Sequence, residues 1–216
     1  MPSGALAIGP RASYGPAPMD FREFRPEGTP EHVRDLAVAC VQFVERATGV
    51  QLDFTSDTLP LLDFYLRSVG TSQPEIRGLV APAAGAYFGE LVRRAFPARW
   101  HAPESDHPAW RIEFETCFLF FNPIALALEA IDGHEAVEGG AGFGVTNEDR
   151  GHLVLALEVL GTLPEDEYYL LSTRFDVLES VVDRLMGGAE KEFPGQVRVS
   201  AAAYANVLDP PAARSN

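Results

Sequence analysis

The apolar residues change their period within the chain, and this change constrains the fold more than any other feature. In the first part of the chain, apolar residues recur at steps of three and four, which is typical of helices that bury one face. At Trp110, Ile112 and Phe114 they instead alternate with charged residues, which indicates a half-buried strand, and Cys117–Phe121 continues as a more apolar strand. Farther on, the helical period returns. The sequence therefore predicts a mainly helical α+β domain with a small antiparallel sheet of two to three strands at about residues 99–121.

Prolines and glycines mark where the predicted helices begin and end, because proline suits the first helical position and glycine suits the position after the last turn. The predicted helices cover residues 30–49, 55–70, 74–95, 123–133, 153–160, a segment beginning at Pro164, 175–186 and 201–208. Pro82 predicts a kink in the third helix, since its ring clashes with the preceding turn. Gly187 and Gly188 are predicted to stop the helix before them. Residues 133–147 contain five glycines and no regular period, so they are predicted to form a loop.

The two ends of the chain are predicted to lie outside this domain. Residues 1–28 contain many Gly, Pro and Ala residues and no apolar period, which is typical of a flexible tail. Residues 209–216 form a second, shorter tail. A single α+β domain over residues 29–208 remains, and no internal repeat divides it.

Composition excludes several classes of partner. Thirty-one acidic residues against 17 basic ones give a formal net charge of -14, which opposes binding to nucleic acid or anionic lipid. No uncharged apolar run reaches the roughly 18 residues of a membrane helix, and residues 1–10 lack the basic start of a secretory signal. Cys40 and Cys117 lie within apolar patterns, as expected of buried, reduced thiols. We therefore expect a cytoplasmic protein without a nucleic-acid or membrane partner. The oligomeric state stays open.

The densest group of reactive side chains lies in the third predicted helix. Tyr87, Glu90 and Arg94 are spaced by three and four residues, so they share one helix face. Glu90 beside an aromatic ring and a cation could act as a general base, which would make the protein a small hydrolase or transferase. Glu90 could instead form an ion pair with Arg93 or Arg94 and tie this helix to the strand that carries Trp100. The structural interpretation is the better supported one, since ion-pair networks perturb carboxylates without any catalysis.

The same helix carries a resemblance to a known family. Residues 85–94 have the sequence pattern Gly-x-Tyr-x-Gly-Glu-x-x-Arg-Arg. Trp100 and a predicted strand follow shortly after it. In this it resembles a group of uncharacterised bacterial domains of unknown function. The resemblance covers about residues 50–185 and includes the later Glu-Tyr-Tyr-x-x-Ser-x-Arg-Phe stretch. It implies an α+β fold of this outline, and it implies no catalytic residues.

Two segments invite a cofactor interpretation. His101 and His107 flank Glu104 and Asp106, and these residue types can bind a divalent metal ion. Polar residues in a short loop between strands are more often simply solvated, so we predict no metal. The glycine-rich run 139–144 does not fit Gly-x-Gly-x-x-Gly, and no P-loop Lys-Ser/Thr follows it. We therefore predict no cofactor.

Acidic residues are concentrated in one part of the chain. Residues 129–167 contain ten acids and one base, Arg150, a net charge of -9, whereas residues 77–99 have a net charge of +3. Such a segment can dock a basic protein, and it can also serve only to keep the protein in solution. With no catalytic motif present, we predict a non-enzymatic binding protein with a basic protein partner, and an immunity-like role is the sharpest form of this prediction. The residues predicted to contact that partner are acids with two aromatic anchors beside them: Glu148, Asp149, Glu165, Asp166, Glu167, Tyr168 and Tyr169.

Overall fold

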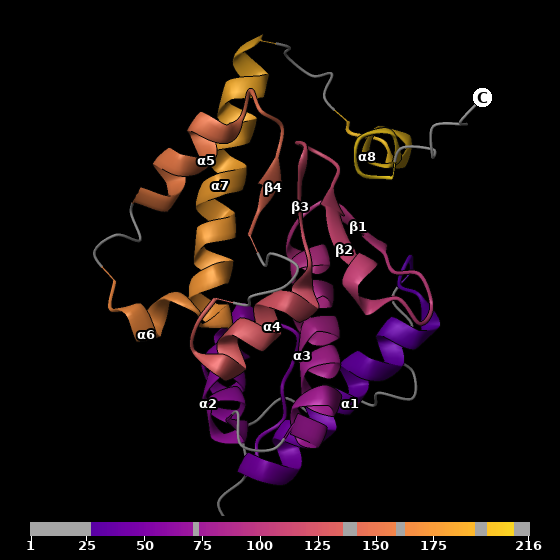
Figure 1. Ribbon diagram of the computed structural model, residues 1–216, viewed down its shortest axis with the longest axis vertical. Coiled ribbons are helices and arrows are strands. Elements are labelled where there is room, and N and C mark those ends of the chain that lie inside the picture. The colour runs from indigo at the N-terminus through magenta and orange to yellow at the C-terminus, as the bar shows by residue number, and fades with distance from the viewer. Residues whose placement is uncertain (1–26, 71–73, 136–141, 159–162, 193–197, 210–216) are drawn as a thin grey trace, which may run out of the picture.

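A computed structural model of the protein describes residues 27–70, 74–135, 142–158, 163–192 and 198–209 (Figure 1). The helices are α1 (Glu31–Thr48), α2 (Leu59–Val69), α3 (Pro74–Ala95), α4 (Pro123–Asp132), α5 (Arg150–Leu157), α6 (Glu165–Tyr168), α7 (Leu171–Glu192) and α8 (Ala201–Leu208). Two short 3₁₀ turns, η1 (Ser56–Thr58) and η2 (His107–Ala109), precede α2 and β2. No described helix is both long and apolar enough to cross a membrane. Of the two predicted tails, only residues 27, 28 and 209 belong to the described part of the chain.

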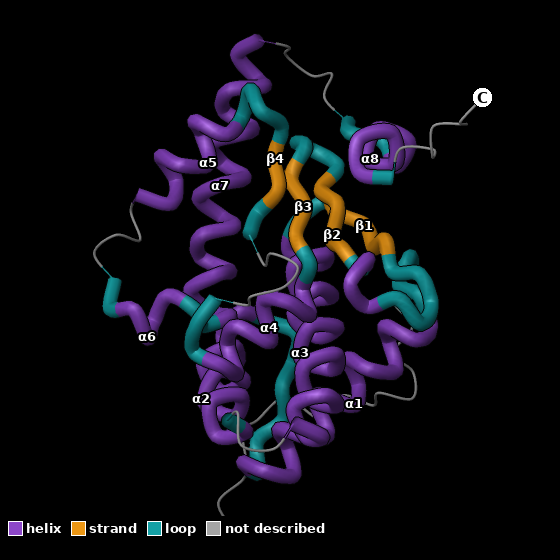
Figure 2. Tube along the Cα trace, in the orientation of Figure 1, coloured by secondary structure: helices purple, strands orange, loops and turns teal. Residues whose placement is uncertain are grey.

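A small antiparallel sheet completes the fold and confirms the predicted α+β class (Figure 2). Its strands, in spatial order, are β1 (Ala98–His101), β2 (Arg111–Phe114), β3 (Leu119–Phe121) and β4 (Gly144–Val145). The register places Trp100 opposite Ile112 and Arg99 opposite Glu113. The first three strands match the predicted position, but the predicted strand number was too low. The fourth strand lies in the segment predicted to be a loop, and two residues are too few to show an alternating pattern.

Helix α3 lies at the centre of the molecule (Figure 1) and is buried on all sides between Ala83 and Val92. Small residues let its neighbours approach closely. A Cβ atom at Gly85 would lie 2.6 Å from the Cα atom of Ile124 in α4, and a Cβ atom at Gly89 would lie 2.2 Å from the indole ring of Trp100 in β1. The helix therefore holds α4 against one part of its surface and the sheet against another.

The sheet has two different faces. On the face toward α3, Ile112 and Phe121 belong to the hydrophobic core, where the ring of Phe88 lies 6.0 Å from that of Phe121. On the opposite face, the side chains of Arg111 and Glu113 are also buried, beneath the segment that contains α8. Strand β2 is consequently buried on both faces, although its alternating pattern predicted a strand that is buried on one.

Helix α7 is longer than predicted. It continues through Gly187 and Gly188 and ends at Glu192, so the predicted stop at these glycines was wrong. Each glycine in a helix interior costs only about 1 kcal/mol relative to alanine, which a long helix with a buried face can absorb. Val181, Val182 and Leu185 provide that buried face just before the glycines.

Asp63 joins the two halves of the chain. This buried residue of α2 accepts hydrogen bonds from the main-chain N–H groups of Leu171 (2.7 Å) and Ser172 (3.1 Å) and from the Ser172 hydroxyl (2.6 Å). Burial raises the pKa of the Asp63 carboxyl, although the hydrogen bonds from Ser172 and Leu171 act in the opposite direction. Asp63 thus caps the first turn of α7 from another helix, which fixes α7 against α2.

Replacement of Asp63 should show how much this cap contributes. Asp63→Ala leaves the N–H groups of Leu171 and Ser172 without their acceptor in a buried position, so we expect the free energy of unfolding to fall by about 2 kcal/mol. Asp63→Asn keeps one acceptor oxygen and should lose less. Urea unfolding monitored by circular dichroism measures both values, and equal stability of the two variants would show that the cap is not what holds α7.

Candidate functional site

Glu90, the candidate general base, has no exposed surface and belongs to a closed set of hydrogen bonds. Arg93 donates to both of its carboxylate oxygens at 2.9 Å, and the Thr29 hydroxyl donates to Oε2 at 2.8 Å. Arg94 and the Trp100 indole donate at 3.3 Å each. Burial opposes ionisation, but the hydrogen bonds from Arg93, Thr29 and Trp100 outweigh it, so the pKa of Glu90 lies below its ordinary value. A general base needs the opposite shift. The arrangement fits the structural interpretation of Glu90, because it ties α3 to β1 and to the start of α1.

Tyr87 and Arg94 both contact one aromatic ring, that of Phe54. The Tyr87 ring is stacked on Phe54 with centroids 4.6 Å apart, and the Arg94 guanidinium lies 4.4 Å from the centroid of Phe54. The Tyr87 hydroxyl accepts a hydrogen bond from the Phe54 N–H at 2.9 Å and lies 3.2 Å from the Thr58 hydroxyl. Burial raises the pKa of Tyr87. The structure therefore joins Tyr87 and Arg94 in a packed contact that holds the segment before α2, whereas Glu90 is joined to Arg94 but not to Phe54 by its hydrogen bonds. Their catalytic role stays a prediction.

The candidate metal residues His101 and His107 lie in different elements, β1 and η2. The His107 ring packs edge-on against Trp110, with centroids 4.9 Å apart, and His32 packs on the same indole at 5.3 Å. Within the described ranges, no three His, Cys, Asp or Glu side chains are grouped so that they could hold a metal ion.

Two members of the acidic segment 129–167 do not contribute to a surface charge. Glu129 is buried and forms an ion pair with Arg174 of α7 at 3.0 Å. Asp132, whose side chain is almost fully buried, is paired with Arg77 of α3. Both acids bind α4 to neighbouring helices. The negative surface is therefore smaller than the sequence suggests.

Other acids of this segment lie around α5. Glu148 and Asp149 precede this helix and Glu158 follows it; Glu148 and Glu158 are exposed, whereas Asp149 is half-buried and accepts a hydrogen bond from the Thr146 hydroxyl at 2.8 Å. The exposed residues Asp166 and Glu167 lie in α6, beyond the other end of α5 (Figure 1). The predicted partner residues are thus separated into two groups, with α5 between them.

Tyr168 and Tyr169 are half-buried and contact the molecule itself. The Arg174 guanidinium lies 4.1 Å from the ring centroid of Tyr168 and 5.7 Å from that of Tyr169, and the two rings meet edge to face. They support the buried Arg174–Glu129 pair. Their part in contacting a partner stays a prediction.

Sequence reasoning missed the apolar surface of α5 itself. Val154 is 51% exposed and Leu155 is 46% exposed, although both lie in the middle of the helix. Ala156 is buried, while Leu153 and Leu157 are half-buried. A helix that is apolar on nearly every side is normally enclosed, so this exposure is unusual for a surface helix. The missed signal was the continuous apolar run Leu153–Leu157, which has no polar stripe for solvent.

We call the exposed part of this helix the α5 face and define it by Glu148, Val154, Leu155 and Glu158. Val154 and Glu158 are one helical turn apart, so the aliphatic centre directly adjoins an acidic edge. Arg150, one turn before Val154, is the exposed base beside it. Helix α5 packs against α7 (Figure 1), and the α5 face presents a small apolar centre with mainly acidic ends.

Comparisons of the chain with known protein families, with curated proteins and with solved structures gave no match. The resemblance of residues 85–94 to uncharacterised bacterial domains therefore stays a prediction.

Proposed function

We propose that the protein is a binding protein without catalytic activity and that its α5 face contacts a basic protein. The observation that carries this proposal is the exposure of Val154 and Leu155 between exposed acids at both ends of one helix. Protein interfaces combine a small apolar centre, which is dehydrated on binding, with a polar rim that stays near solvent. An immunity-like role, in which the acidic rim covers the basic surface of a nucleic-acid-cutting protein, is the sharpest form of this proposal.

The chemistry of the α5 face defines the partner. Aliphatic side chains fit a shallow apolar depression, and the exposed acids Glu148 and Glu158 favour Lys or Arg around that depression. The net charge of -14 increases the rate of encounter with a basic protein and disfavours acidic competitors. The enzyme alternative has no comparable support among the described residues, because the Glu90 side chain has no exposed surface and its carboxylate is occupied by hydrogen bonds.

Substitutions at the α5 face test this proposal against matched controls. The double variant Val154→Ala/Leu155→Ala should reduce capture of the partner at least about tenfold, because it removes the apolar centre. Leu79→Ala, at an exposed leucine of α3, changes the same kind of side chain elsewhere and should leave capture unchanged. Chemical cross-linking in lysate followed by mass spectrometry measures which species is lost.

Charge reversal separates the rim from the centre. Glu148→Lys/Glu158→Lys should weaken capture and flatten its dependence on salt, since fewer charges remain to be screened. Glu45→Lys, at an exposed acid of α1, is the control, because it reverses one acidic charge elsewhere on the surface. If Val154→Ala/Leu155→Ala and Glu148→Lys/Glu158→Lys both capture the same species to the same extent as wild type, the α5 face is not the binding site.

A further inference from the structure

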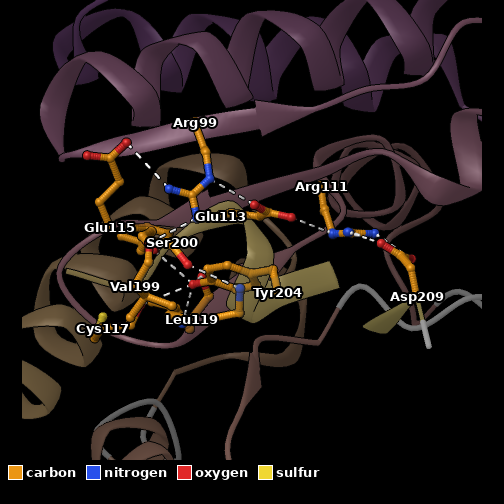
Figure 3. A network of polar contacts seen from close by, with 12 residues as sticks. Arg99, Arg111, Glu113, Glu115, Cys117, Leu119, Val199, Ser200, Tyr204 and Asp209 are labelled. Carbon is orange, nitrogen blue, oxygen red and sulfur yellow. Dashed lines mark hydrogen bonds and ion pairs between the residues drawn. The ribbon is translucent and has the colours of Figure 1, made fainter. Parts of the chain in front are cut away.

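A fully buried tyrosine anchors the C-terminal segment on the outer face of the sheet. Tyr204 of α8 has no exposed surface, and its hydroxyl accepts a hydrogen bond from the Leu119 N–H at 3.0 Å (Figure 3). The same hydroxyl lies 2.8 to 3.0 Å from the carbonyl oxygens of Phe114, Cys117 and Leu119, to one of which it donates. The turn between β2 and β3 thus forms a notch whose main-chain groups converge on one phenol.

Residues of the sheet also contact the Tyr204 ring and the main chain just before α8. Phe118 stacks on the Tyr204 ring with centroids 4.4 Å apart, and the Arg99 guanidinium lies 5.4 Å from the ring centroid. The Val199 N–H donates to the Glu115 carbonyl at 2.8 Å, and Arg99 donates to the Val199 carbonyl at 3.0 Å. The C-terminal segment is therefore bound through its main chain at one end and through an aromatic ring in its middle.

An ion pair holds the other end of the segment. Asp209 follows α8, and its two carboxylate oxygens accept hydrogen bonds from the two Nη atoms of Arg111 at 3.3 and 2.6 Å (Figure 3). Arg111 is almost fully buried and also donates to Glu113 at 2.9 Å. The sheet therefore binds a helical segment that carries a tyrosine, Tyr204, and a carboxylate five residues later, Asp209.

The surface beneath α8 combines a row of paired charges with the rings of Phe118 and Phe120, which contact Tyr204. The charged row consists of Arg99, Glu113 and Arg111, which pair with one another within β1 and β2 at 3.0 and 2.9 Å. Removal of α8 would hydrate this row and expose the two rings, whereas removal of α3 would expose the hydrophobic core. Most of α8 itself faces solvent: Ala201, Ala202, Ala205, Asn206 and Val207 are exposed. The contact thus resembles that of a bound peptide more than that of a core helix.

We infer that this face of the sheet is a peptide-docking site that α8 fills within its own chain, and that it takes α8 of a second copy when its own α8 is released. The second copy is the occupant whose chemistry is fully matched, because it carries the same Tyr204 and Asp209. Within one chain the tether gives α8 a high effective concentration, so the intramolecular contact prevails until that tether is cut or shortened. Exchange of an identical element between copies is a low-cost route to a dimer. The site lies across the sheet from the α5 face, so it is independent of the proposed function (Figure 1).

The first test cuts the tether in the otherwise complete chain. A protease recognition sequence replaces residues 193–197, and after cleavage a fluorescent peptide covering residues 198–209 is added. We expect the labelled peptide to replace the cut fragment, as measured by native mass spectrometry and fluorescence anisotropy, while the circular dichroism of the remainder is retained. The peptide with Tyr204→Phe should bind at least about tenfold more weakly, because the buried carbonyl groups of the notch lose their phenol O–H donor and the Leu119 N–H keeps only the Cys117 carbonyl as acceptor.

A peptide with Val207→Ala is the matched control, since this side chain is 62% exposed, and its affinity should stay within about twofold of the parent peptide. Failure of the labelled peptide to enter, equal binding of the Tyr204→Phe peptide, or loss of folded structure once the fragment leaves would each overturn the inference.

The second test addresses the second copy directly. Deletion of residues 193–197 removes the span between α7 and the segment that contains α8, which lie apart in Figure 1. We expect this variant to form a dimer by sedimentation, an excess of the free peptide to dissociate it, and Tyr204→Phe to return it to a monomer. A deletion variant that is folded and monomeric at all concentrations would show that a second copy is not the occupant.

Discussion

Gly85→Ala is expected to lower the free energy of unfolding by about 3 kcal/mol, although alanine is the better helix former. The added Cβ atom would lie 2.6 Å from the Cα atom and 2.8 Å from the main-chain nitrogen of Ile124. No rotamer change can relieve a contact with backbone, so α3 and α4 must move apart and lose packing along their whole contact. Overpacking of this kind typically costs about 1 to 3 kcal/mol, and the upper end applies here because two helices shift.

Gly78→Ala is the matched control within the same helix. A Cβ atom at Gly78 has no neighbour within 4 Å, so only the helix propensity changes and stability should rise by about 0.5 to 1 kcal/mol. Chemical denaturation of both variants measures opposite signs for the same substitution. If Gly85→Ala proved as stable as Gly78→Ala, the close approach of α3 and α4 would be wrong.

Glu90→Gln is the second substitution with a large expected effect. It keeps the size of the side chain but removes the charge that Arg93, Arg94 and Trp100 share, leaving cations near the interior without a counter-charge. Breaking a buried ion pair costs about 3 to 5 kcal/mol, and we expect about 3 because both arginines are partly exposed. Glu31→Gln, which breaks the exposed pair with Arg34, should cost less than about 0.5 kcal/mol.

The effect of Glu90→Gln should depend on pH. The pKa of Glu90 is lower in the folded protein than in the unfolded chain, so the stability that ionisation contributes is fully present above the ordinary pKa of about 4.3. It is lost as the pH falls through the lower, folded-state pKa. The stability difference between wild type and Glu90→Gln should therefore be constant near neutrality and shrink below about pH 4. Urea unfolding at several pH values measures this difference. A difference that grows toward acid pH would mean that Glu90 is protonated in the folded protein.

Local patterns made most of the fold predictable. Alternation over Trp110, Ile112 and Phe114 located the sheet, and apolar residues at helical spacing located α1 to α4 and α8. Contacts between distant residues could not be predicted in this way. Asp63 caps α7 across 108 residues, and no local pattern distinguishes it from an ordinary acid on a helix.

The candidate site was less predictable, because a sequence shows where charge lies along the chain and not whether it is exposed. Glu129 and Asp132 were counted with the acidic segment, yet each is neutralised by an arginine from another helix. Conversely, the apolar run of α5 is the kind that normally lies inside a protein, and only the structure shows Val154 and Leu155 at the surface. Exposure depends on which helices cover one another, which a single sequence does not specify.

The enclosure of α3 also implies an order of events during folding. Its neighbours α1, α4 and the first strands lie within about 50 residues of it, so the contacts that bury it close short loops. The contacts of Tyr204 with Leu119 and of Asp63 with Leu171 close loops of 85 and 108 residues. We therefore expect the region up to α4 to be assembled in the folding transition state and the C-terminal helices to join afterwards. Substitutions at Gly85 would then slow folding, whereas substitutions at Tyr204 would mainly speed unfolding.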